Sequence, residues 1–197
     1  MATRHNSKFL PRKKTSYCAK SVSRDITAYG AAKMHLNAIE EHLSNTWQML
    51  VGESLAFSAQ AVCTQELLAQ HYFVVTLHPL PSGHLAGVGL AIAEQDARKV
   101  TSQMFDLPSD ELSPADITDA CSELCNVFAS GVPSHISDNL TLDLGLPSPL
   151  SHEQFLIILA ASTVCGSYIA RQHERHIQVI IFESLEVPAA AGWSPAT

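Results

Sequence analysis

The sequence predicts an α+β fold, with two long helices packed on a mixed, largely antiparallel β-sheet. Two stretches carry apolar residues at three- and four-residue spacing, which is typical of amphipathic helices. Each is followed by apolar runs separated by turn residues, which indicates strands and hairpins. Because both halves share the outline of a long helix followed by about three strands, we expect pseudo-repeated helix-plus-strands halves.

The first half opens with a predicted helix that ends at Gly52. Its apolar positions are three or four residues apart: Leu36, Ile39, Leu43, Trp47 and Leu50. A strand is expected over residues 55–63. Residues 73–77 and 84–92 are predicted to form a hairpin around the turn at 79–83, whose sequence is Pro-Leu-Pro-Ser-Gly.

Between the halves we expect a short amphipathic helix at residues 94–105 and a loop at 107–112. The second long helix is predicted to begin after Ser113. A serine followed by proline, with Asp116 three residues on, is typical of a helix N-terminus. Gly131 and Pro133 mark its end.

The second half continues with a predicted strand at 140–144 and a Gly- and Pro-rich loop up to Pro149. An apolar run at 155–159 fits either a helix or a strand. A closing hairpin completes this half: residues 163–170, a turn at 172–175 and residues 177–182.

Charge is distributed unevenly along the 197 residues. The net charge is −7, but seven of the twelve basic residues lie in the first 24, and no acidic residue precedes Asp25. Residues 25–197 therefore carry −14. We expect a flexible basic arm at 1–28, a folded domain at 29–187 and a loose tail at 188–197. So acidic a body would repel a phosphate backbone, which argues against nucleic-acid binding.

The composition argues against a membrane protein and against a secreted protein. The longest apolar stretch, residues 154–170, is interrupted by polar residues and is too short for a membrane span, so no membrane insertion is expected. The basic N-terminus lacks the apolar segment of a secretory signal. Five cysteines without a Cys-x-x-Cys pair suggest free thiols in a reducing compartment, and we infer a cytoplasmic protein.

The second long helix separates its residues into two faces. An apolar stripe is predicted to face the core: Ile117, Ala120, Cys121, Leu124 and Phe128. The opposite side carries Asp119, Glu123, Asn126 and Ser130. For an arbitrary helix, such a face is most often only a solvated surface.

The spacing on this face is specific. Asp119, three residues, Glu123, two residues, Asn126, twenty-two residues and Pro149 resemble the signature of the CheC/CheX/FliY family of chemotaxis phosphatases. That family places Asp or Ser at the first position. The first predicted helix offers Glu41 and Asn45, which are four residues apart instead of three. The chain is therefore similar to the single-site CheX branch, with Ser130 standing where many relatives have glycine.

The resemblance implies a phosphatase that stimulates hydrolysis of the aspartyl phosphate of a CheY-like response regulator, in chemotaxis or related two-component signalling. Glu123 and Asn126 would be the catalytic residues, with Asp119 and Pro149 in support of the motif. An amide can orient a water molecule, whereas a carboxylate is better suited to pairing with a cation of the regulator. No cofactor of its own is expected, and Mg²⁺ would belong to the phosphorylated receiver domain. The resemblance also implies a homodimer.

Other interpretations remain beside this one. A module of the same fold would bind a receiver domain or motor component as an adaptor without hydrolysing anything. Ten histidines offer no metal-ligand spacing, since His173 and His176, the closest pair, lie in a predicted turn without companion ligands. Cys121 and Cys125 lie on the predicted buried side, so we expect core thiols there and neither a metal site nor a redox site.

Overall fold

A computed structural model describes residues 36–62, 69–78, 85–133, 143–172 and 175–184 of the chain. Within these ranges it contains four helices and a seven-stranded sheet. The elements follow the chain in this order: α1 (Leu36–Val51), β1 (Ser58–Ala59), β2 (His71–His78), β3 (Leu85–Ile92), α2 (Glu94–Phe105), α3 (Pro114–Gly131), β4 (Asp143–Leu144), β5 (Ser148–Leu150), α5 (His152–Ala160), β6 (Thr163–Gln172) and β7 (Arg175–Ser184).

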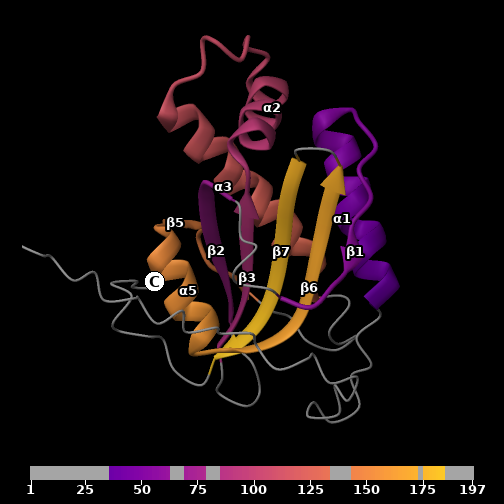
Figure 1. Ribbon diagram of the computed structural model, residues 1–197, viewed down its shortest axis with the longest axis vertical. Helices are drawn as coiled ribbons and strands as arrows, with labels where there is room; N and C mark the ends of the chain where they lie inside the picture. The colour runs from indigo at the N-terminus through magenta and orange to yellow at the C-terminus, as the bar shows by residue number, and fades with distance from the viewer. Residues whose placement is uncertain (1–35, 63–68, 79–84, 134–142, 173–174, 185–197) are drawn as a thin grey trace, which may run out of the picture.

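The sheet shows the predicted internal repeat. The strand order is β1-β6-β7-β3-β2-β4, β5 also pairs with β2, and every pairing among the described strands is antiparallel. β7 and β3 lie side by side at the centre, flanked by β6 and β2 (Figure 1). The outer strands of each half therefore pair with the other half: β1 with β6, and β4 and β5 with β2.

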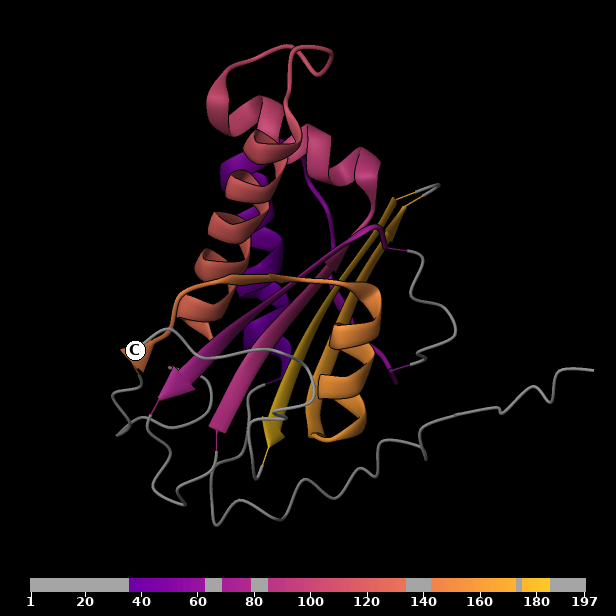
Figure 2. The same ribbon diagram turned by 90° about the vertical axis from the view of Figure 1, so that its left-hand side faces the viewer.

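Helices cover both faces of the sheet. Figure 2 shows α1 and α3 on one side of the sheet and α5 on the other, with α2 at one end of the α1–α3 layer. Alternate residues of β3 supply the two cores: Val88 and Leu90 pack with α1 and α3, whereas Ala91 packs with α5. The sheet is thus buried on both faces, which explains why β3 contains no polar side chain and why the middle of β7, residues 179–182, is an unbroken apolar run.

The predicted helix signals are confirmed. α1 ends before Gly52, which has a φ of 75° and a backbone N–H that bonds the Gln48 carbonyl at 2.9 Å. At the start of α3, the Ser113 hydroxyl accepts from the Asp116 backbone N–H, and the Asp116 carboxylate accepts from the Ser113 backbone N–H. These bonds to Ser113 lower the pKa of the Asp116 carboxyl.

The two predicted hairpins are also confirmed, as β2–β3 and β6–β7. α2 occupies the residues expected for the short helix. The predicted turn at 79–83, residues 140–142 of the predicted strand at 140–144, and the arm and tail at 1–28 and 188–197 lie outside the described residues and stay predictions. None of the helices in the described part of the chain is long and apolar enough to cross a membrane.

The structure settles one open alternative and corrects two sequence-based expectations. The ambiguous run at 155–159 is helical, because Ser151 and Gln154 form a capping box that starts α5. The expected loop up to Pro149 contains the strand β5, which tolerates proline because it lies at the edge of the sheet. The strand expected over 55–63 is reduced to Ser58–Ala59, the part that pairs with β6.

We predict that Gly87→Ala destabilises the protein. Gly87 lies opposite Phe182 on β7, and a Cβ at this position would overlap the Phe182 ring. A free-energy loss of about 1–3 kcal/mol is expected, although Gly→Ala substitutions without steric conflict usually stabilise. Urea unfolding of Gly87→Ala, Phe182→Leu and the double variant measures the coupling. Strictly additive losses would show that the overlap is not the cause.

We further predict that Ser113→Ala lowers the free energy of unfolding by about 1 kcal/mol, because it removes the acceptor that caps α3. Ser122→Ala, in the middle of the same helix, is the matched control and should leave stability unchanged or slightly raised. Urea unfolding monitored by circular dichroism gives both values. Equal stability of the two variants would contradict the role of the cap.

Candidate functional site

The predicted inner face of α3 is buried as expected. The stripe residues are all buried against the sheet and α1: Ile117, Ala120, Cys121, Leu124 and Phe128. Cys125 is also buried, and its thiol lies 3.9 Å from the Val88 carbonyl of β3. The Phe128 ring meets the Phe57 ring edge-on, with centroids 5.6 Å apart. These contacts fix the rotation of α3 about its own axis.

The opposite face of α3 carries the sequence-predicted polar residues. Asp119 and Glu123 are exposed and Asn126 is half-buried, and their three- and four-residue spacing places them on one side of the helix. Within the described parts of the chain, no hydrogen bond or ion pair holds Glu123 or Asn126. Both side chains are therefore available to a partner.

Hydrogen bonds beyond those of the regular helical ladder close the last turn of α3. The Val132 N–H bonds the Ala129 carbonyl, and His42 of α1 donates from Nε2 to the Phe128 carbonyl at 3.3 Å. Ser130 is exposed, and its hydroxyl donates to the Val127 carbonyl at 2.8 Å. The serine that departs from the family pattern is thus directed back to its own helix.

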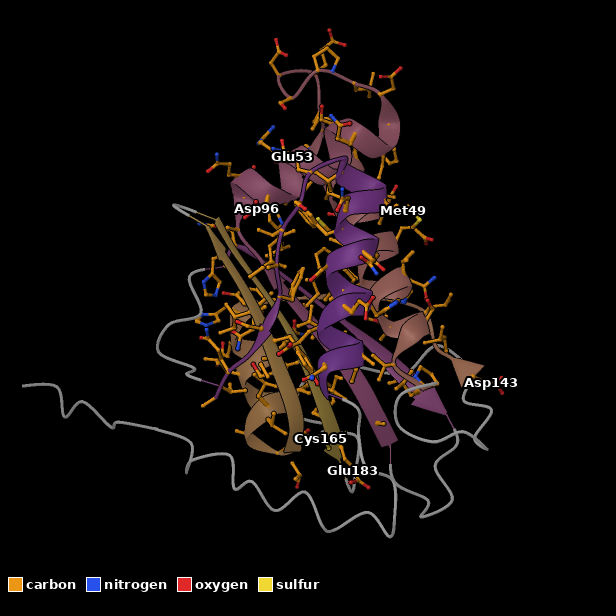
Figure 3. The ribbon with its side chains drawn as sticks, turned by 90° about the vertical axis from the view of Figure 1, so that its right-hand side faces the viewer. Met49, Glu53, Asp96, Asp143, Cys165 and Glu183 are labelled. Carbon is orange, nitrogen blue, oxygen red and sulfur yellow. The ribbon has the colours of Figure 1, made fainter. Side chains whose placement is uncertain are left out.

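Pro149 is exposed in the middle of β5, opposite Phe73 of β2. β4 and β5 both pack beside α3. Figure 3 shows Asp143, the first residue of β4, near the C-terminal end of α3. The four-position pattern therefore brings together a helix face, which holds Asp119, Glu123 and Asn126, and the edge segment that contains Pro149.

The corresponding helix of the first half, α1, carries a weaker version of this face. Glu41 and Asn45 are both exposed on α1. They are four residues apart, so a partner that matches the three-residue spacing on α3 would not match α1 in the same way. The two residues serve as internal controls for the α3 face.

The other candidate chemistries receive no structural support. Burial raises the pKa of the Cys121 thiol to about 12 and also raises that of Cys125, so neither forms a thiolate near neutral pH. Among the described residues, no three His, Cys, Asp or Glu side chains are grouped in a way that would hold a metal ion. His71 instead pairs with Glu94 at 2.5 Å, and Glu94 also accepts from Arg98.

One surface feature was missed by the sequence reasoning. Leu144, the last residue of β4, and Leu146, between β4 and β5, are 37% and 70% exposed. The sequence signal was an uncharged run, Leu-Gly-Leu-Pro-Ser-Pro-Leu, in which glycine and two prolines indicate an irregular strand. Hydrophobicity alone favoured burial of both leucines.

No family model and no curated protein matches the sequence. Solved structures do match. The chemotaxis protein CheX from Vibrio vulnificus aligns with a TM-score of 0.56 and 12% identity, over 76% of this chain and 95% of that one. A chain of the CheX–CheY–BeF₃–Mg²⁺ complex from Borrelia burgdorferi aligns with a TM-score of 0.58 and 11% identity, over 77% and 99%.

The likeness extends beyond the CheX proteins. A chain of the FliM–SpeE complex from H. pylori aligns with a TM-score of 0.56 and 9% identity, over 80% of this chain and 88% of that one. At these identities the alignments show the fold. The chain has the α+β fold of the CheX and CheC-like chemotaxis proteins.

Proposed function

We propose that the chain stimulates hydrolysis of the aspartyl phosphate of a CheY-like receiver domain. The observation that carries this proposal is the outward face of α3, where Glu123 and Asn126 are accessible and have no partner in the described residues. The fold supports it, because one structural neighbour is part of a CheX–CheY–BeF₃–Mg²⁺ complex.

Hydrolysis of an aspartyl phosphate needs a water molecule in line with the scissile P–O bond. The water attacks phosphorus, the bond to the aspartyl oxygen breaks, and phosphate and a carboxylate are released. The Asn126 carboxamide accepts from this water through its oxygen and donates to a phosphoryl oxygen through its nitrogen. The amide is neutral and approaches the phosphoryl group without charge repulsion, so its contribution is positioning of the nucleophile.

Glu123 has a different role in the proposal. Its carboxylate would be repelled by the phosphoryl group but attracted by a lysine or arginine of the receiver domain. The two cations of α2 do not compete for it, because Arg98 pairs with Glu94 and Lys99 with Glu53. Glu123 therefore docks α3, and Mg²⁺ stays with the receiver domain. Asp119 and Pro149 support the geometry of helix and edge segment.

An adaptor role is the second candidate, since a chain of a FliM–SpeE complex shares the fold. An adaptor would bind the receiver domain through the same face and leave the phosphate in place. The fold is compatible with both roles, and phosphate release separates them. We also propose a cytoplasmic location, and a homodimer formed through a sheet edge, for which β1, at the edge away from the β4–β5 segment, is available in the described part.

Asn126→Ala is expected to reduce the stimulated rate of phosphate release about a hundredfold at saturation, because the nucleophilic water loses its positioning group. Its affinity for the receiver domain should change little. Asn45→Ala removes the matching amide from α1 and serves as the control, with full activity expected. Single-turnover phosphate release measures both. An Asn126→Ala variant as fast as wild type would refute the role of this residue.

Glu123→Ala is expected to raise the half-saturating concentration of the receiver domain about tenfold, while the rate at saturation stays within about twofold of wild type. Glu41→Ala on α1 is the control. The difference between Glu123→Ala and wild type should shrink as salt is added, since salt screens an exposed ion pair. A loss confined to the saturated rate would assign Glu123 to the chemical step.

A further inference from the structure

The edge segment beside α3 contains a β-bulge. Leu77 of β2 faces Leu144, and Val74 faces Ser148. Three steps along β2 therefore correspond to four steps along the β4–β5 segment. One residue among positions 145–147 is extra, and such a bulge turns a side chain out of the regular alternation of the strand.

The bulge is anchored on both sides. The Gly145 N–H donates to the Thr76 carbonyl at 2.8 Å, and a Cβ at Gly145 would overlap the Thr76 hydroxyl. On the other side, Ser148–Leu150 pairs with β2. Leu146 lies between these two anchored points, with 70% of its surface exposed. Its outward position is therefore fixed by the backbone on either side.

Exposure of large hydrophobic side chains is unusual in the described part of the chain. Only five large hydrophobic side chains are exposed among the described residues, and Leu144 and Leu146 are two of them. Residues 144–150 carry no charge. Removing such side chains from water is favourable, and a leucine pair held outward on a rigid strand is suited to a contact that forms only on binding.

The position of the bulge points to the partner. β4 and β5 pack beside α3, and Figure 2 shows this segment passing the C-terminal half of α3, the half that carries Asn126. The apolar pair thus lies in a segment that packs beside the helix carrying Glu123 and Asn126. A second copy of the chain would bring two bodies of −14 charge together here, whereas a partner with cations near an apolar patch would complement both parts.

We propose that Leu146, assisted by Leu144, is the apolar anchor that docks the receiver domain against the α3 face. This inference rests on the proposed function for its choice of partner. The polar face supplies the ion pair and the water-positioning amide, and the bulge supplies the desolvated contact that holds the receiver domain in register. Affinity is divided between the two surfaces, and the rate of hydrolysis depends on α3 alone.

The test uses the full chain with Leu146→Ser, and with Leu107→Ser as the control. Leu107 is also an exposed leucine, but it precedes α3 at the end opposite to the bulge. The probe is each CheY-like receiver domain of the host cell, loaded with Mg²⁺ and beryllofluoride. We expect Leu146→Ser to raise Kd about tenfold without changing the rate of phosphate release at saturation, and Leu107→Ser to bind like wild type. Thermal unfolding verifies that both variants fold.

Each other outcome has a definite meaning. Unchanged affinity of Leu146→Ser overturns the anchor and leaves the proposed function standing. Loss of self-association with unchanged receiver affinity overturns it in favour of a second copy of the chain. If wild type binds the receiver domain but releases no phosphate, the proposed hydrolysis is wrong. The Kd of Leu146→Ser, compared with that of wild type, then still decides whether Leu146 is the anchor. If wild type binds none of the receiver domains, both proposals are overturned.

Discussion

The packing of α3 against the sheet is the constraint on which the rest of the site depends. The helix has one buried stripe, from Ile117 to Phe128, and that stripe can face the core in only one rotation. Once the rotation is fixed, Glu123 and Asn126 must point outward, whatever their function. The capping box at Ser113 fixes where the helix begins, and His42 of α1 satisfies a carbonyl near its end. Helix ends held in this way present the outward residues with little freedom.

Local signals in the sequence predicted most of the fold, because the elements that position the site have strong ones. The period of α3, the capping pair Ser113 and Asp116, and Gly52 after α1 each depend on a few neighbouring residues. The helix α5 was not predicted, although Ser151 and Gln154 carried the same capping signal, because the apolar run that follows fits a strand equally well. The outward face of α3 was predictable from its period. The function expected of this face was inferred from the motif spacing and not from the helical period.

The edge of the sheet was the least predictable part, for a physical reason. Pairing of the β4–β5 segment with β2 joins residues that are about 70 positions apart, and short strands without alternation give no local sign of it. Leu146 is exposed because the β4–β5 segment has one residue more than the part of β2 with which it pairs. The residue pattern of a single strand cannot reveal such a difference. The pattern that ends at Pro149 nonetheless reaches into this segment, which packs beside α3.

Phosphate release from a phosphorylated CheY-like receiver domain, followed with and without the wild-type chain, tests the central claim most directly. The expected result is faster release at amounts of the chain far below those of the receiver domain, with a rate that saturates as the receiver concentration rises. Release at the receiver domain's own rate, under conditions where the two proteins demonstrably bind, would contradict the claim and leave an adaptor of the same fold.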